Sequence, residues 1–168
     1  MSKDQAGIVG VVVAELRGPD GELKERCETH NLVTAVGDQY YAGRAALSTS
    51  LPAQVTGFRL GTGSTAPAKT GAGAAIVTYL AGSNKANDSG FPTAVAGVVT
   101  WKRTYAPGEA TTASPITEVV LNTDTIANDN ATTATAANTI ARALLTGISG
   151  KAAGDTLTVT WTHTLLGA

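Results

Sequence analysis

The chain has 168 residues and a mass of 16.9 kDa, which fits one domain or one domain with an arm. Its 12 basic and 13 acidic side chains leave a net charge of −1, without the basic excess of a typical nucleic-acid-binding protein. The longest apolar runs, such as Val11 to Ala14, are too short to span a membrane, and the polar residues 1–5 argue against a secretory signal. The single cysteine, Cys27, excludes an internal disulfide framework.

The composition also suggests self-association. Charged residues make up only 15% of the chain, and aromatic residues only 5%. Low charge weakens the repulsion between copies, and a core with few aromatic rings buries less apolar area per residue. We therefore expect a protein that is made in the cytoplasm and completes its stability within an assembly.

The first predicted element is a β-hairpin. Its first strand, residues 7–17, has apolar side chains on both faces, so we expect both faces of its first half to be covered. Pro19 and Gly21 favour a turn, because proline fixes φ and glycine tolerates the left-handed region. The return strand, 22–30, alternates between a charged face and a face that is expected to point inward. The inward face consists of Leu23, Glu25, Cys27 and Thr29.

A helix is predicted after the hairpin, capped by Asn31 or Thr34 and running to about Leu47. Two glycines inside this segment lower its helix propensity, so the helix should depend on packing. A narrow apolar stripe recurs at helical spacing and supplies that packing. The stripe consists of Val36, Tyr40, Gly43 and Leu47.

The rest of the chain is predicted to form strands joined by loops. The clearest strand is the last, in which threonines alternate with Leu157, Val159, Trp161, His163 and Leu165. In total we expect seven or eight strands and one helix: a mainly β, antiparallel β-sandwich or jelly-roll-like domain. Residues 1–30 would form an arm and hairpin, and 31–168 the helix and sandwich, together as one compact unit. The predicted strands are 54–61, 75–80, 95–105, 116–122, 140–145 and 155–165, with long loops at 62–73, 82–92 and 123–138.

Three short patterns carry possible chemistry. The segment 61–66 matches a loose dinucleotide-binding pattern, but Pro67 follows where a helix should begin, so a loop is the better interpretation. Cys27 and His30 are three residues apart on a strand and point to opposite faces, which prevents a shared metal ion. His163 lies on an apolar face, where a buried histidine with a hydrogen-bond partner is favoured over a pH-responsive contact.

Catalytic motifs are lacking in the sequence. It contains no Gly-x-Ser-x-Gly elbow and no phosphate-binding loop, and its carboxylates fall at strand ends and in loops without a pairing pattern. We therefore expect a protein that is not an enzyme and that uses no cofactor and no metal ion.

Four segments, in order, resemble one family. They are His30–Thr34 with Gly37 and Tyr40 to Ala42; Phe58–Pro67, which reads FRLGTGSTAP; Tyr105–Ala110 followed by Ile116–Glu118; and Ala141–Arg142 followed by Asp155–Trp161, which ends in DTLTVTW. Together these segments resemble small virion proteins of tailed bacteriophages. The long Ala/Thr/Asn stretch at 123–138 departs from that pattern. The resemblance implies a structural part of a phage particle, and it supplies no catalytic residue.

The position in the particle is a further inference. A tail fibre usually has a coiled-coil or repetitive shaft, and neither appears in the sequence. We therefore favour a capsid decoration (cement) protein on the head surface, bound to the major capsid protein and forming a homotrimer, without nucleic-acid or membrane partners. A tail-fibre, adaptor or receptor-binding tail component is the alternative, in which the loops 82–92 and 123–138 would recognise host groups.

The expected contact residues lie on the first strand and on the helix. The first strand has an additional apolar face that a partner could cover. The two adjacent tyrosines point to different sides of the helix, so at least one should face away from the core. Trp101 and Trp161 are expected in the core. The predicted partner contacts are Ile8, Val9, Val11, Val13, Tyr40 and Tyr41.

Overall fold

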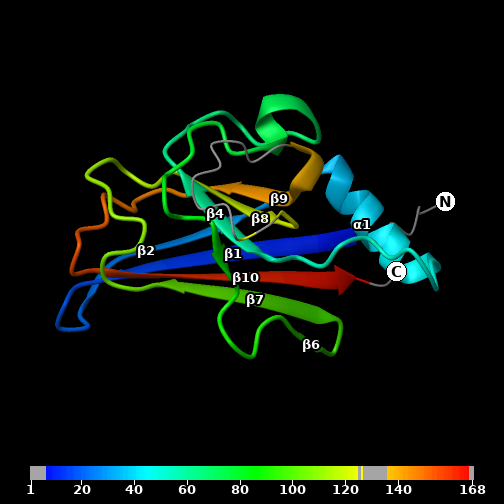
Figure 1. The fold of residues 1–168 in the computed structure, drawn as a ribbon, viewed down its shortest axis with the longest axis horizontal. Coiled ribbons are helices and arrows are strands. Elements are labelled where there is room, and N and C mark those ends of the chain that lie inside the picture. The colour runs from blue at the N-terminus through cyan, green and yellow to red at the C-terminus, as the bar shows by residue number, and fades with distance from the viewer. Residues whose placement is uncertain (1–6, 125, 127–135, 167–168) are drawn as a thin grey trace.

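The computed structural model describes residues 7–124, 126 and 136–166. These residues form two antiparallel five-stranded sheets and one α-helix, which confirms the predicted β-sandwich (Figure 1). Sheet A has the strand order β2-β1-β10-β7-β6, and sheet B the order β3-β9-β8-β4-β5. The strands are β1 (Gly7–Arg17), β2 (Leu23–His30), β3 (Leu32–Val33), β4 (Gly57–Gly61), β5 (Lys85–Ala86), β6 (Thr93–Val95), β7 (Val98–Tyr105), β8 (Glu118–Asn122), β9 (Thr139–Leu144) and β10 (Thr156–Leu166).

The core lies between the two sheets. The alternating residues of β1 and β10 that face sheet B are buried along most of each strand, as the period of two requires. Trp101 and Trp161 are both in this core, as predicted, with 2% and 0% of their surface exposed. Phe58 on β4 packs its ring against Trp161, so that the aromatic side chains of the two sheets meet.

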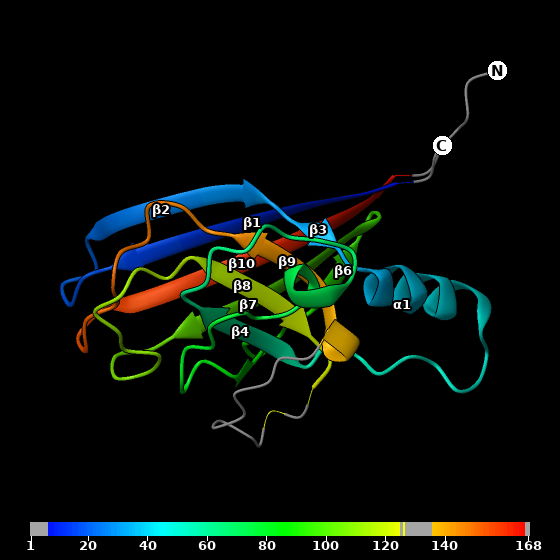
Figure 2. The same ribbon diagram turned by 90° about the horizontal axis from the view of Figure 1, so that it is seen from above.

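The helix α1 (Ala35–Ala46) lies at one end of the sandwich, where β1 begins and β10 finishes (Figures 1 and 2). Of the two predicted caps the structure selects Thr34, whose Oγ1 accepts the backbone N–H of Gly37 at 3.0 Å. Gly37 is required by packing, because a Cβ there would come within 2.2 Å of the Ile140 carbonyl oxygen on β9. The helix ends before Leu47, which is half exposed and does not extend the apolar stripe.

Residues 62–84 cover the outer face of sheet B as a third layer. This segment includes the 3₁₀ helix η1 (Gly71–Ala74), and a second 3₁₀ helix, η2 (Ala136–Asn138), precedes β9. Ile76 and Tyr79 of the layer pack on Val120 of β8. Two backbone hydrogen bonds, from Thr62 N to Thr78 O and from Leu80 N to Leu60 O, hold the layer on the edge of the sheet.

Several local predictions were wrong. The predicted strand 75–80 is not a strand and contains only an isolated bridge from Tyr79 to Gly61. The predicted strand 95–105 is divided, because the chain reverses at Ala96 and Gly97, both with positive φ, and Val95 is 71% exposed on β6. The described residues contain ten strands rather than seven or eight, the additional ones being the short β3, β5 and β6.

The hairpin also differs from its prediction in two respects. The register between β1 and β2 shifts at Leu16/Arg17, and this bulge leaves Leu23 48% exposed instead of facing inward. The first half of β1 is covered on one face only, because Val9, Val11 and Val13 all keep part of their surface exposed. Cys27 is buried and His30 exposed, which confirms that they point to opposite faces.

Candidate functional site

The predicted contact residues on β1 are divided between its two faces. Val9, Val11 and Val13 point away from sheet B, whereas Ile8 alternates with them and belongs to the face that points toward the core. Ile8 pairs across the strands with Leu165, which is 44% exposed near the end of β10. Only the three valines therefore contribute to a common outer surface.

This outer surface continues across β10, β7 and β6. The register places Val9 beside Thr164, Thr164 beside Val98, and Val98 beside Val95, so one row crosses four strands. Two further rows run parallel to it, and their side chains carry no charge apart from Lys102 at one end of the third row, whose other end, Val13, pairs with the charged Glu28 of β2. We call this surface the Val/Thr face; it consists of Val9, Val11, Val13, Thr93, Val95, Val98, Thr100, Thr160, Thr162 and Thr164.

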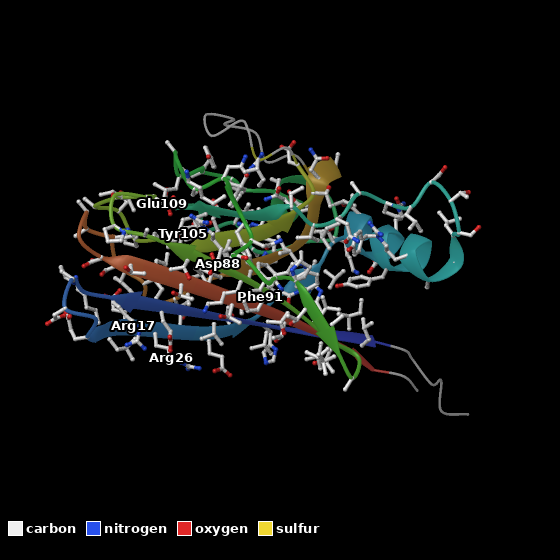
Figure 3. The ribbon with its side chains drawn as sticks, turned by 60° about the horizontal axis from the view of Figure 1, so that its bottom comes forward. Arg17, Arg26, Asp88, Phe91, Tyr105 and Glu109 are labelled. Carbon is white, nitrogen blue, oxygen red and sulfur yellow. The ribbon has the colours of Figure 1, made fainter. Side chains whose placement is uncertain are left out.

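A charged border adjoins the Val/Thr face at the end of β1 and β2 that is remote from α1. Figure 3 shows Arg17 and Arg26 there. Arg26 donates from Nη2 to Glu28 Oε2 at 2.6 Å, and its Nε lies 3.7 Å from Glu15 Oε1. These ion pairs are largely exposed, so each contributes at most about 1 kcal/mol to stability. The border therefore marks where the uncharged surface stops.

The two predicted contact tyrosines lie elsewhere, where α1 packs on the inner side of sheet A. Tyr40 is buried and donates from its hydroxyl to Gln54 Oε1 at 3.2 Å, and Tyr41 is half-buried with its hydroxyl bonded to His163 Nδ1. The two rings meet edge to face at a centroid distance of 5.2 Å. Burial raises the pKa of both phenols, so both are neutral at pH 7.

His163 is buried beside these rings and has hydrogen-bond partners, as predicted. Trp161 Nε1 donates to His163 Nε2 at 2.9 Å and also contacts Asn31 Oδ1 at 3.1 Å. Because indole N–H is only a donor, Nε2 must accept, and the ring proton therefore lies on Nδ1, facing the Tyr41 hydroxyl. Burial lowers the pKa of His163 to about 4, so the ring is neutral at pH 7.

Two charged residues, which belong to the four segments that resemble phage virion proteins, form a buried ion pair, here called the clasp, that sequence reasoning missed. Glu118 on β8 and Arg142 on β9 are both fully buried, and Arg142 Nη2 donates to Glu118 Oε2 at 2.7 Å. The same carboxylate accepts the backbone N–H groups of Gly63, Val77 and Thr78. The clasp therefore binds the covering layer to sheet B. The sequence signal that could have identified this pair is one charged residue in each of two predicted strands, 116–122 and 140–145, that otherwise carry no charge.

The clasp also explains the glycine-rich segment 61–66. A Cβ at Gly61 or Gly63 would come within 2.5 Å of Glu118 Oε1, so only glycine allows this close approach. The N–H of Gly63 is already bonded to Glu118, and Arg142 Nη1 donates to the carbonyl oxygen of Thr65. These hydrogen bonds hold the loop in place, and they give the segment a structural role.

The loop 82–92 lies along the edge of β7 and is anchored by Asp88 (Figure 3). Asp88 N donates to Lys102 O at 2.8 Å, and its carboxylate accepts the backbone N–H and the hydroxyl of Thr104. Arg103 links this region to Glu109 at 2.6 Å and stacks on Tyr105. The loop thus covers a strand edge that would otherwise be open. Most of the loop 123–138 lies outside the described residues.

Within the described residues, no group of three or more His, Cys, Asp or Glu side chains is placed to hold a metal ion. In that same part of the chain, no helix is long and apolar enough to cross a membrane. Comparison with protein-family models, curated proteins and solved structures finds no match to this chain.

Proposed function

We propose that this chain is a non-enzymatic structural protein of a tailed-bacteriophage particle, a decoration (cement) protein on the head surface. The observation that carries the proposal is the Val/Thr face, an uncharged surface that spans β1, β10, β7 and β6. Valine and threonine are desolvated at low cost compared with charged groups, so such a face suits a wide contact with another protein. The four segments that resemble phage virion proteins support the choice of partner.

The proposed partner is the major capsid protein, at junctions between its subunits. A protein that binds only the assembled shell adds its binding free energy to the stability of the shell, because dissociation of the shell requires its release. A homotrimer fits this position, since the three-fold junctions of a shell call for three-fold symmetry in the bound protein. The buried clasp and the anchored loop 82–92 support a rigid module of this kind.

The location is tested by electron microscopy of purified particles labelled with gold-conjugated antibodies against the chain. Label at many copies over the head supports the decoration role. Label at the neck or tail tip refutes it in favour of a tail-fibre, adaptor or receptor-binding component. Particles without label refute a virion role altogether.

The contact surface is tested by a pair of variants with matched exposure. Val9 on the Val/Thr face is 43% exposed, and Leu51, in the segment after α1, is 45% exposed. We expect Val9→Asp to weaken binding to heads that lack the protein by about tenfold or more, because a carboxylate must be desolvated at the contact. Leu51→Asp should bind normally. Equal binding of the two folded variants would refute the assignment of this face.

A further inference from the structure

A cavity of about 320 Å³ opens between α1 and the β6–β7 hairpin, on the side of sheet A where Trp101 and Val99 point inward. Its volume is at the lower end of the roughly 300–1,000 Å³ of ligand pockets. The walls are mainly apolar and aromatic, and they come from α1, β6, β7 and the end of β10. The residues that form the binding surface are Tyr40, Tyr41, Arg44, Val99, Trp101 and Leu165.

Of the described residues that line the cavity, Arg44 is the only one that is charged at pH 7. Its guanidinium lies 5.5 Å from the centre of the Tyr40 ring, and Nη2 donates to the carbonyl oxygen of Pro52. Nε is buried without a hydrogen-bond partner, and the guanidinium also forms a side-chain hydrogen bond with Tyr40. In the part of the chain that the structure describes, no Asp or Glu lines the cavity. A cation that faces no carboxylate among the described residues therefore lies at the wall of an apolar cavity.

We propose that this cavity binds a small carboxylate carried on an apolar, ring-sized body. The planar guanidinium of Arg44 matches a carboxylate in geometry and charge, and Trp101 and Tyr41 provide aromatic surface for the body. A single cation compensates one negative charge, so a doubly charged phosphate would leave a charge unpaired against apolar walls. The same chemistry is offered by a free aromatic acid and by the C-terminal residue of a peptide.

This inference goes beyond the proposed role in the virion and does not depend on it. The cavity is lined from the inner side of sheet A, through Val99 and Trp101, whereas the Val/Thr face lies on the outer side and shares with the cavity only Thr93, on the edge strand β6. The Val9→Asp variant should therefore leave ligand binding unchanged, and filling the cavity should leave binding to heads unchanged.

The test uses the full-length chain, with phenylacetate and its uncharged analogue phenylacetamide as probes. We expect phenylacetate to shift the indole N–H resonance of Trp101 in a saturable manner, and phenylacetamide to bind about tenfold more weakly or not at all. Titration with N-acetylphenylalanine distinguishes the two sources of ligand. Tighter binding of N-acetylphenylalanine assigns the cavity to a peptide C-terminus, and tighter binding of phenylacetate assigns it to a free acid.

Two variants and a control complete the test. Arg44→Gln should weaken phenylacetate binding by about tenfold, whereas Arg17→Gln, a similar loss of charge at the remote border, should not change it. Ala94→Phe, which places a ring at the mouth of the cavity on exposed β6, should abolish binding with Arg44 still in place. Equal affinity for acid and amide, unchanged binding by Ala94→Phe, or no saturable shift in the wild-type protein would overturn the proposal.

Discussion

Replacement of Glu118 by glutamine should remove much of the stability of this protein. The carboxylate and the guanidinium of Arg142 are both 0% exposed, and the two carboxylate oxygens accept from Arg142 and from three backbone N–H groups. A glutamine side chain keeps one acceptor oxygen, but its NH₂ group is itself a donor and would face the donor groups of Arg142 or of the backbone. It also leaves the Arg142 charge buried without a counterion, which typically costs about 3–5 kcal/mol. For a domain of this size, such a loss lowers Tm by roughly 6–20 °C.

Urea denaturation followed by circular dichroism, together with calorimetry, measures this change. The control is Asp38→Asn, which removes a carboxylate from the Lys69–Asp38 pair, where both side chains are more than half exposed. That pair should contribute at most about 1 kcal/mol. A double variant, Glu118→Gln with Arg142→Met, should recover part of the loss because no charge remains unpaired. If Glu118→Gln unfolds within about 1 kcal/mol of the wild type, the clasp does not stabilise the covering layer.

The remaining predictions concern the aromatic end, the helix cap and the core. Burial lowers the pKa of His163 from 6.5 in the unfolded chain to about 4 in the folded protein. As the pH falls from 6.5 to 4, the unfolded chain therefore binds a proton that the folded protein does not, and the free energy of unfolding should drop by about 3 kcal/mol. In urea denaturation at a series of pH values, His163→Phe should lose this part of the pH dependence; an unchanged slope would assign it to other groups. Thr34→Ala removes the α1 cap and should cost about 1–2 kcal/mol by the same assay, with Thr34→Ser close to wild type, and equal losses in both variants would contradict the capping role. Phe58→Ala in the core should lower the free energy of unfolding, measured by thermal unfolding, by about 3–5 kcal/mol. Val95→Ala on the surface is the control and should change it by less than about 0.5 kcal/mol. A comparable loss in both variants would mean that Val95 is packed against neighbouring residues.

Long periodic segments could be predicted from the sequence, and their predicted boundaries lie close to the observed ones. The alternation along β1 and β10 identified their extent and the buried series that contains Trp161 and His163, because a strand with one buried face must repeat every two residues. The sequence offers two candidates for the residue that caps α1, because a threonine or asparagine before a helix can accept hydrogen bonds from the free N–H groups of its first turn. These features depend on neighbours in the sequence, which is why they can be read locally.

Short elements could not be predicted, because their pairing comes from distant segments. β5 has only two residues and exists through its pairing with β4, and the reversal at Ala96 and Gly97 that exposes Val95 carries little signal in an alternating stretch. The bulge at Leu16/Arg17, which turns Leu23 outward, also cannot be predicted from the alternation of residue types along the strand.

The candidate sites were decided by the tertiary structure. Alternation along β1 already separates Ile8 from Val9, Val11 and Val13, but the strand register decides that these valines lie beside the threonines of β10. The cavity beside Arg44 exists because α1 packs at one end of the sandwich, across from the β6–β7 hairpin. By itself the sequence determined a neutral, mainly β chain with a valine-rich first strand, since composition and period are local properties. Only folding determined which face stays open and which charges become buried, because both depend on residues brought together from opposite ends of the chain.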